Sequence, residues 1–166
     1  MRVSRLASLV LLATLPLAAP AKPWQGINPG VSTQAEVVEK FGEPTTRTKR
    51  GARTVLAYLG EQALPGTKQA QFYTTEDGTV VEITVFIATQ LEREAIEGTY
   101  GRNPEKTFTD AFLPVWIYRS AGVTVYFGKE GYVEAITFGP GTKAAPRPAA
   151  AEARPAPAKA AGPQAQ

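Results

Sequence analysis

A short helix signature occurs twice in this chain, and the duplication restricts the fold more than any other feature of the sequence. Residues 29–44 read PGVSTQAEVVEKFGEP, and residues 89–104 read TQLEREAIEGTYGRNP. In each copy Thr-x-x-Glu, a capping-box spacing, starts an apolar stripe of helical period, and Gly and then Pro follow it. Pro44 prevents the first helix from continuing. Each predicted helix has about ten residues, too few to be stable alone in water, so each must pack on another element.

The residues that end these helices can be predicted individually. Either Ser32 or Thr33 is expected to cap the first helix at its N-terminus, and Thr89 is expected to cap the second. Gly42 and Gly101 are expected at the C-termini, because glycine adopts the left-handed backbone conformation that ends many helices. In this interpretation all of these positions are structural.

Three β-rich runs follow each predicted helix. Asp77-Gly78 and Glu130-Gly131 are hairpin signals between such runs. Aligning Tyr73 with Tyr126 also aligns these glycines, at a separation of about 53 residues. The sequence therefore predicts an α+β fold of two tandem α-β-β-β repeats, with short helices packed on one face of antiparallel sheet, and leaves open whether the sheet is continuous. Alternation predicts that one set of side chains faces the helices, namely Val81, Ile83, Val85 and Ile87.

The two ends of the chain differ in composition from the middle. Residues 1–21 have two arginines, an apolar run and Ala19-Pro20-Ala21, the layout of a cleavable secretory signal peptide. Residues 142–166 consist mostly of Ala, Pro and scattered charge, which predicts a disordered tail. The predicted repeats span 22–88 and 89–141. No lipid-accepting cysteine exists, so the expected location is periplasmic or secreted, without a transmembrane anchor.

The first repeat resembles a known family over about 60 residues. GINPGVSTQAEVVEKFGEP, the aromatic strand VLAYL and the hairpin ending in FYTTEDGTVVEITVF are similar to the SmpA/OmlA, or BamE-like, domain. Two such modules in tandem also resemble β-lactamase inhibitory proteins, in which paired helix-on-sheet repeats form a concave binding sheet. The resemblance implies a protein-binding module of the cell envelope.

Charge and composition restrict the chemistry of the chain. Residues 22–141 carry 12 basic and 14 acidic groups, a net charge of 12 − 14 = −2, so we expect no nucleic-acid partner. The sequence contains neither histidine nor cysteine, the residue types that most often serve as general base, thiol nucleophile and zinc ligand. We therefore expect a protein that is not an enzyme and has no cofactor and no metal site.

Two stretches are candidates for binding. Residues 47–53 hold four cations in what is predicted to be a loop, which is either simply solvated or contacts anionic lipid or cell-wall polymer. Residues 112–118 are apolar at both alternating sets of positions, which predicts either a strand covered on both faces or an aromatic binding surface. The cations are Arg47, Lys49, Arg50 and Arg53, and the predicted partner-binding residues are Tyr73, Phe112, Trp116, Tyr118 and Tyr126.

Together these features predict an exported, non-catalytic interaction or scaffold module of the bacterial cell envelope, with an envelope protein as its partner. Two alternatives remain open from the sequence. One is a proteinaceous enzyme inhibitor of the β-lactamase inhibitory type. The other is a periplasmic protein that binds lipid or another small ligand, which would need a closed apolar cavity between the sheet and the helices.

Overall fold

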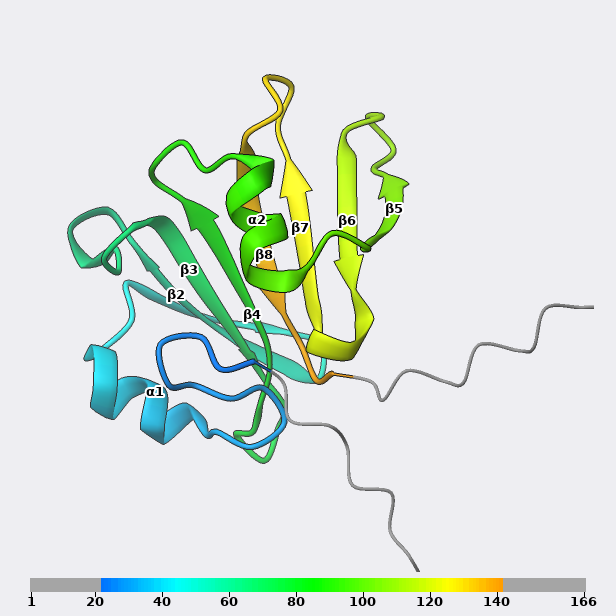
Figure 1. Cartoon of the computed structure of the whole chain (residues 1–166). Coiled ribbons are helices and arrows are strands. Elements are labelled where there is room, and N and C mark those ends of the chain that lie inside the picture. Colours follow the sequence, from blue (N-terminus) through cyan, green and yellow to red (C-terminus); the bar gives the residue numbers. More distant parts are fainter. Residues whose placement is uncertain (1–21, 142–166) are drawn as a thin grey trace, which may run out of the picture.

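The computed structural model describes residues 22–141 of the chain, and the predicted signal peptide (1–21) and tail (142–166) lie outside the described residues. Figure 1 shows the short helices in front of a twisted sheet. The elements are, in chain order, α1 (Gln34–Phe41), β1 (Thr46–Arg50), β2 (Arg53–Leu59), the 3-10 turn η1 (Gly60–Gln62), β3 (Thr67–Thr74), β4 (Val80–Ile87), α2 (Arg93–Tyr100), β5 (Glu105–Phe108), β6 (Pro114–Tyr118), the 3-10 turn η2 (Arg119–Ala121), β7 (Val123–Phe127) and β8 (Val133–Phe138).

The eight strands form one antiparallel sheet in the order β1-β2-β3-β4-β8-β7-β6-β5. The predicted arrangement of two tandem α-β-β-β repeats is therefore wrong, since four strands follow each helix and all eight share one sheet. The additional strands are β1 and β5, which form the two edges and are exposed at every residue. Their polar sequences carry no alternating apolar pattern, so periodicity could not identify them.

The helix ends follow their local sequences in part. Thr33 is the N-cap of α1 and shares a complete capping box with Glu36, whereas the hydroxyl of Ser32 accepts a hydrogen bond from the N–H of Asn28 at 3.1 Å. The predicted C-caps Gly42 and Gly101 occupy those positions with φ of 79° and 100°. The prediction of Thr89 as a cap is wrong, because α2 begins after Glu92.

One face of the sheet carries both helices and the hydrophobic core. Val37 of α1 and Ile96 of α2 are buried in the same cluster as inward side chains of the central strands. Under α1 the rings of Phe41, Tyr58 and Phe72 lie 5.6–6.0 Å apart, centroid to centroid. Such aromatic contacts add specific geometry to a large area of buried surface. We refer to this side as the helix face and to the other as the open face.

The described chain has two halves, α1 to β4 and α2 to β8. In each half, a tyrosine of the second strand forms a hydrogen bond with the C-terminal end of the helix. The hydroxyl of Tyr58 on β2 donates to the carbonyl oxygen of Gly42 at 2.8 Å, and that of Tyr118 on β6 donates to Gly101 at 3.1 Å. Both acceptors are C-cap carbonyls, which lack a partner within the helix. Burial raises the pKa of both tyrosines, which further favours the protonated form that donates these hydrogen bonds.

Replacing either tyrosine by phenylalanine tests these contacts. Tyr58→Phe and Tyr118→Phe are each expected to lower the free energy of unfolding by about 1 kcal/mol, because the ring remains and only one hydrogen bond is lost. Urea denaturation followed by tryptophan fluorescence measures the change. Tyr73→Phe is the control, since the hydroxyl of Tyr73 donates only to its half-buried neighbour Gln71. Equal losses in all three variants would contradict a role in holding the helices.

The two halves of the sheet meet at β4 and β8. Thr84 pairs with Thr137 in the centre of this contact, and their hydroxyls are 3.1 Å apart. These two residues are also 53 positions apart in the sequence, the separation at which Tyr73 aligns with Tyr126. The hydrogen-bonded pair therefore lies in the middle of the contact that joins the two halves.

The chain leaves the sheet through a close approach of three glycines. The N–H of Gly139 donates to the carbonyl oxygen of Gly122 at 2.7 Å. A Cβ atom on Gly122 would lie 2.1 Å from the oxygen of Gly139 and 2.8 Å from the nitrogen of Gly141. The end of β8 is thereby held against the start of β7. Among residues 22–141, no helix is long and apolar enough to cross a membrane.

Candidate functional site

The open face of the sheet is covered by neither of the two helices in residues 22–141, and it displays side chains that are mostly half-buried. Strand register places two parallel rows across its centre. The first row is Gln71, Thr84, Thr137, Thr124 and Ile117, and the second is Gln69, Phe86, Ala135, Tyr126 and Val115. The first row is mostly polar and the second mostly apolar.

A hollow of about 440 Å³ lies within the second row. Its floor is Ala135, which is in register with Phe86 on one side and Tyr126 on the other. The small alanine between two large aromatic residues leaves the space. We refer to this hollow as the Phe86–Tyr126 slot. Its lining residues are Thr84, Phe86, Thr109, Leu113, Tyr126, Phe127, Glu134, Ala135 and Thr137.

Two further hollows adjoin the slot. One of about 410 Å³ shares Thr137 with it and reaches toward Arg53 and Glu82. The other, of about 520 Å³, shares Leu113 and Glu134 with the slot and lies among the loops at the far end of β8. The shared lining residues make the three hollows one groove that follows β8 along the open face. Ligand sites are concave in this way, with apolar walls and a few polar groups at the rim.

The predicted aromatic residues do not form one surface. Tyr73 and Tyr126 lie on the open face, and burial together with the nearby Glu82 carboxylate raises the pKa of Tyr73. Trp116 is 5% exposed and Tyr118 is 6% exposed, and both lie on the helix face. The Trp116 ring makes an edge contact with Phe127 at 4.8 Å between centroids, so it belongs to the core.

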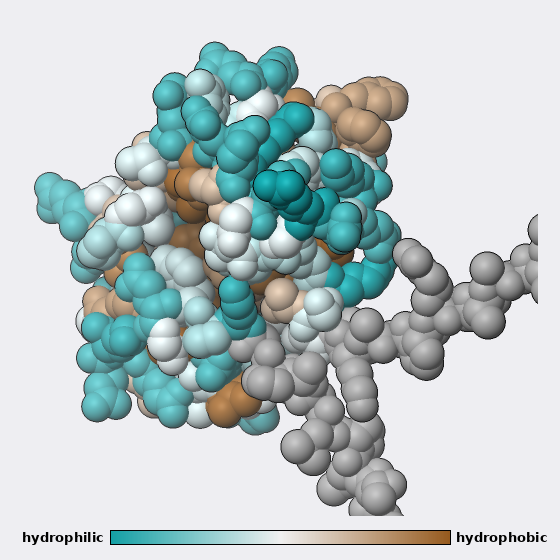
Figure 2. All heavy atoms as spheres, in the orientation of Figure 1, coloured by the Kyte–Doolittle hydropathy of each residue, from teal (hydrophilic) through white to brown (hydrophobic). Residues whose placement is uncertain are grey.

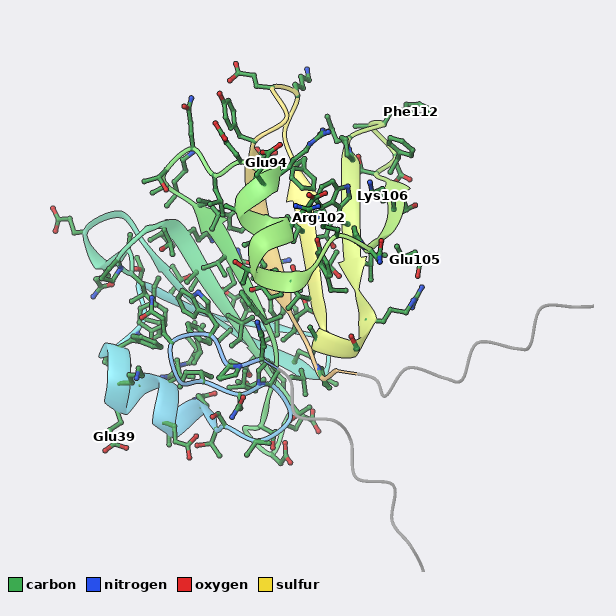
Figure 3. The ribbon with its side chains drawn as sticks, in the orientation of Figure 1. Glu39, Glu94, Arg102, Glu105, Lys106 and Phe112 are labelled. Carbon is green, nitrogen blue, oxygen red and sulfur yellow. The ribbon has the colours of Figure 1, made fainter. Side chains whose placement is uncertain are left out.

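Phe112 lies alone at the tip of the loop between β5 and β6, where Figure 3 shows it directed away from the body of the molecule. It is 86% exposed and has φ of 57°, an unusual value for a bulky residue. Its N–H donates to the carbonyl oxygen of Thr109 at 2.9 Å, which defines the loop. In Figure 2, the hydrophobic atoms visible on the helix side lie mainly in small groups among hydrophilic ones.

The predicted basic loop is instead edge strand β1 and the turn into β2. Three of its cations have acidic neighbours: Arg47 is 3.4 Å from Glu43, Lys49 is 4.0 Å from Glu76, and Arg53 is 3.9 Å from Glu82. Charged side chains on an edge strand also discourage pairing with other chains. Much of this positive charge is therefore balanced locally, and contact of Arg47, Lys49, Arg50 and Arg53 with anionic lipid or cell wall stays a prediction.

Within residues 22–141 no three acidic residues form a group that could hold a metal ion. The acidic turn before β4 has a structural use. Asp77 accepts hydrogen bonds from the hydroxyls of Thr75 and Thr79, and these bonds lower the pKa of its carboxyl group. This is the behaviour expected of a hairpin turn rather than of a ligand loop.

Phe86 is one of the slot residues that were not among the candidates predicted from the sequence. The alternation that assigns Ile83, Val85 and Ile87 to the helix face also assigns Phe86 to the open face. Its aromatic character at that position was the available signal. The floor of the slot could not be inferred in the same way, because Ala135 acquires its neighbours only through the pairing of β8 with β4 and β7.

Comparison with known proteins defines the fold only. No protein-family model matches the chain, and no curated protein matches it. The DUF4309-family protein YjgB of Bacillus subtilis is similar in structure, with a TM-score of 0.52 and 16% identity over 70% of this chain and 83% of that one. A cysteine-rich secretory protein of Staphylococcus aureus, SAV1118, has a TM-score of 0.40 and 12% identity, over 66% of this chain and 42% of that one. The resemblance to the SmpA/OmlA domain stays a prediction, and the chain shares a general fold with YjgB.

Proposed function

We propose that this chain is an exported, non-catalytic protein-binding module of the bacterial cell envelope, and that it binds its partner on the open face. The Phe86–Tyr126 slot carries this proposal. Aromatic residues in partly desolvated pockets contribute most of the affinity at many protein interfaces. The slot and the adjoining hollows offer such a pocket on a face that neither helix covers.

The size of the open face supports a protein partner. Eight strands at about 4.8 Å spacing, with about six residues each at about 3.3 Å, give a surface of roughly 700 Å². A specific protein–protein interface buries about 800 Å² on each partner. A lipid carrier would need a hollow between the sheet and the helices, whereas the three hollows of the groove lie on the open face and its loops.

Site-specific photo-crosslinking in cells tests the proposal. A photoreactive residue at Gln71, on the open face, is expected to capture one defined envelope protein, and Tyr126→Ala is expected to abolish most of the capture. The same residue at Glu39, on the exposed side of α1, is the control (Figure 3). Capture from Glu39 and Gln71 alike, or capture that is indifferent to Tyr126→Ala, would contradict binding at the open face.

The crosslinked partner also decides between the remaining alternatives. If the partner is an enzyme and the purified chain inhibits it stoichiometrically, the module is an inhibitor of the β-lactamase inhibitory type. If the partner has no catalytic activity, the module is a scaffold.

A further inference from the structure

The dimensions of the Phe86–Tyr126 slot restrict what can enter it. Neighbouring strands are about 4.8 Å apart, so Phe86 and Tyr126 are separated by roughly 10 Å across Ala135. A group that contacts both aromatic side chains at about 3.5–4.0 Å needs roughly 7–8 Å between them. The gap between the two aromatic side chains is therefore wide enough for an apolar ring.

The rim of the slot adds a preference for a cation close to that ring. The hydroxyls of Thr84 and Thr137 are hydrogen-bonded to each other, so they do not need a hydrogen-bond partner from a ligand. Glu134 contributes an exposed carboxylate. A ligand that suits the slot therefore combines a compact apolar ring with a neighbouring positive charge.

The chain itself leaves the sheet beside the slot. Gly139 and Pro140 line the neighbouring hollow of about 410 Å³, which shares Thr137 with the slot. The close packing of Gly139 and Gly141 against Gly122 fixes this point of departure. The described residues therefore end, at Gly141, next to this hollow.

We propose that the segment 142–166 of this chain is an intramolecular ligand of the open face, which turns back along β8 and inserts a proline ring into the Phe86–Tyr126 slot. From Gly139 back to Ala135 is four residues of strand, or about 13 Å. From Gly141 to Pro148 is seven residues, which span about 22 Å in an extended proline-rich conformation. The prolines nearest the exit, Pro146 and Pro148, therefore reach the slot with residues to spare for the turn.

The composition of the segment matches the slot. Its only bulky apolar groups are proline rings, and it contains no aromatic residue and no Leu, Ile, Val or Met. Proline-rich segments bind in aromatic-lined grooves elsewhere because little conformational entropy is lost. Arg147 stands between the two nearest prolines, where it can approach Glu134.

The charges also favour binding. The segment has four basic residues and one acidic residue, a net charge of 4 − 1 = +3, whereas residues 22–141 carry 12 − 14 = −2. These opposite net charges attract the segment to residues 22–141 as a whole, and the covalent link raises its local concentration at the sheet. On this basis the segment occupies the slot when nothing else does.

The inference goes beyond the proposed function, because it concerns the isolated chain without any partner. A partner that binds the open face has to displace the segment. In the free chain the segment therefore covers the binding site for the partner. Failure of the segment to bind would leave capture of a partner at Gln71 unaffected, and the two proposals can fail separately.

Paramagnetic NMR on the full chain tests the inference. The sequence contains no cysteine, so Ala149→Cys gives a single site for a nitroxide label. The amide signals of Thr84 and Thr124, on the open face, are expected to lose most of their intensity, and that of Glu39 is expected to keep it. Tyr126→Ala is expected to restore the lost signals, whereas Tyr73→Ala, an open-face tyrosine outside the slot, leaves the loss unchanged.

Three results would overturn the inference. The first is weak attenuation spread evenly over both faces. The second is the same loss of signal in Tyr126→Ala as in Tyr73→Ala, which would place the segment outside the slot. The third is attenuation that appears only when labelled and isotope-enriched chains are mixed, because the occupant would then be the segment of a second copy. The dispersed spectrum of each variant shows that it has folded.

Discussion

Gly122→Ala is expected to lower the free energy of unfolding by roughly 3–4 kcal/mol. Two costs add together at this position. Alanine at φ of 65° is strained by about 1–2 kcal/mol, and a Cβ atom 2.1 Å from the oxygen of Gly139 forces the two backbones apart. The clash is with backbone, so no side-chain rotation relieves it.

Gly51→Ala is the matched control. Gly51 has φ of 59°, but a Cβ atom there would meet nothing within 4 Å. Only the conformational strain remains, so this variant is expected to lose about 1–2 kcal/mol. Urea denaturation followed by the fluorescence of Trp24 and Trp116 measures both variants. If the two variants lose the same free energy of unfolding, then Gly122, just before β7, does not lie as close to Gly139, just after β8, as the structure shows.

Trp116→Ala is expected to cost about 3–5 kcal/mol of stability, the usual range for a large aromatic residue removed from a core. Trp116 is 5% exposed, and it packs against Phe127 on the helix face. Lys106 lies over the same ring, with its Nζ atom 4.9 Å from the centroid, and adds a cation–π contact. Truncation leaves a large cavity under α2.

Thermal unfolding followed by circular dichroism compares this variant with Tyr126→Ala. Tyr126 lies on the adjacent strand but on the open face, where it is half-buried, so its removal leaves a smaller gap. We expect the melting temperature to fall much further in Trp116→Ala. Similar melting temperatures would mean that Trp116 is not part of the core, and would favour the binding role considered from the sequence.

The central strands could be predicted from the sequence because their inward side chains are apolar and alternate. The edge strands could not be, since TRTKR and EKTF are stabilised by pairing with their neighbours rather than by burial. A β-bulge caused a smaller error. The register between β3 and β4 shifts between Tyr73 and Thr74. As a result Val80, rather than the predicted Val81, is buried in the core.

The start of α2 was misplaced for a tertiary reason. The carbonyl oxygen of Leu91 accepts a hydrogen bond from the N–H of Val133 at 2.9 Å, so the segment before α2 is tied to the start of β8. Thr89 is therefore drawn away from the helix, although its local sequence suits a cap. The slot could not be predicted for the same reason. Phe86, Ala135 and Tyr126 lie on three different strands, and only the pairing of those strands brings them together.

The position of β8 has a consequence for how the molecule reaches its final form. The last strand of residues 22–141 lies in the middle of the sheet, between β4 and β7. Until it is in place, both halves present a bare inner edge of backbone N–H and C=O groups, and these can pair with any other extended chain. The risk of mispairing is therefore concentrated in the interval before the final strand docks, and that docking is also the step that joins the two halves.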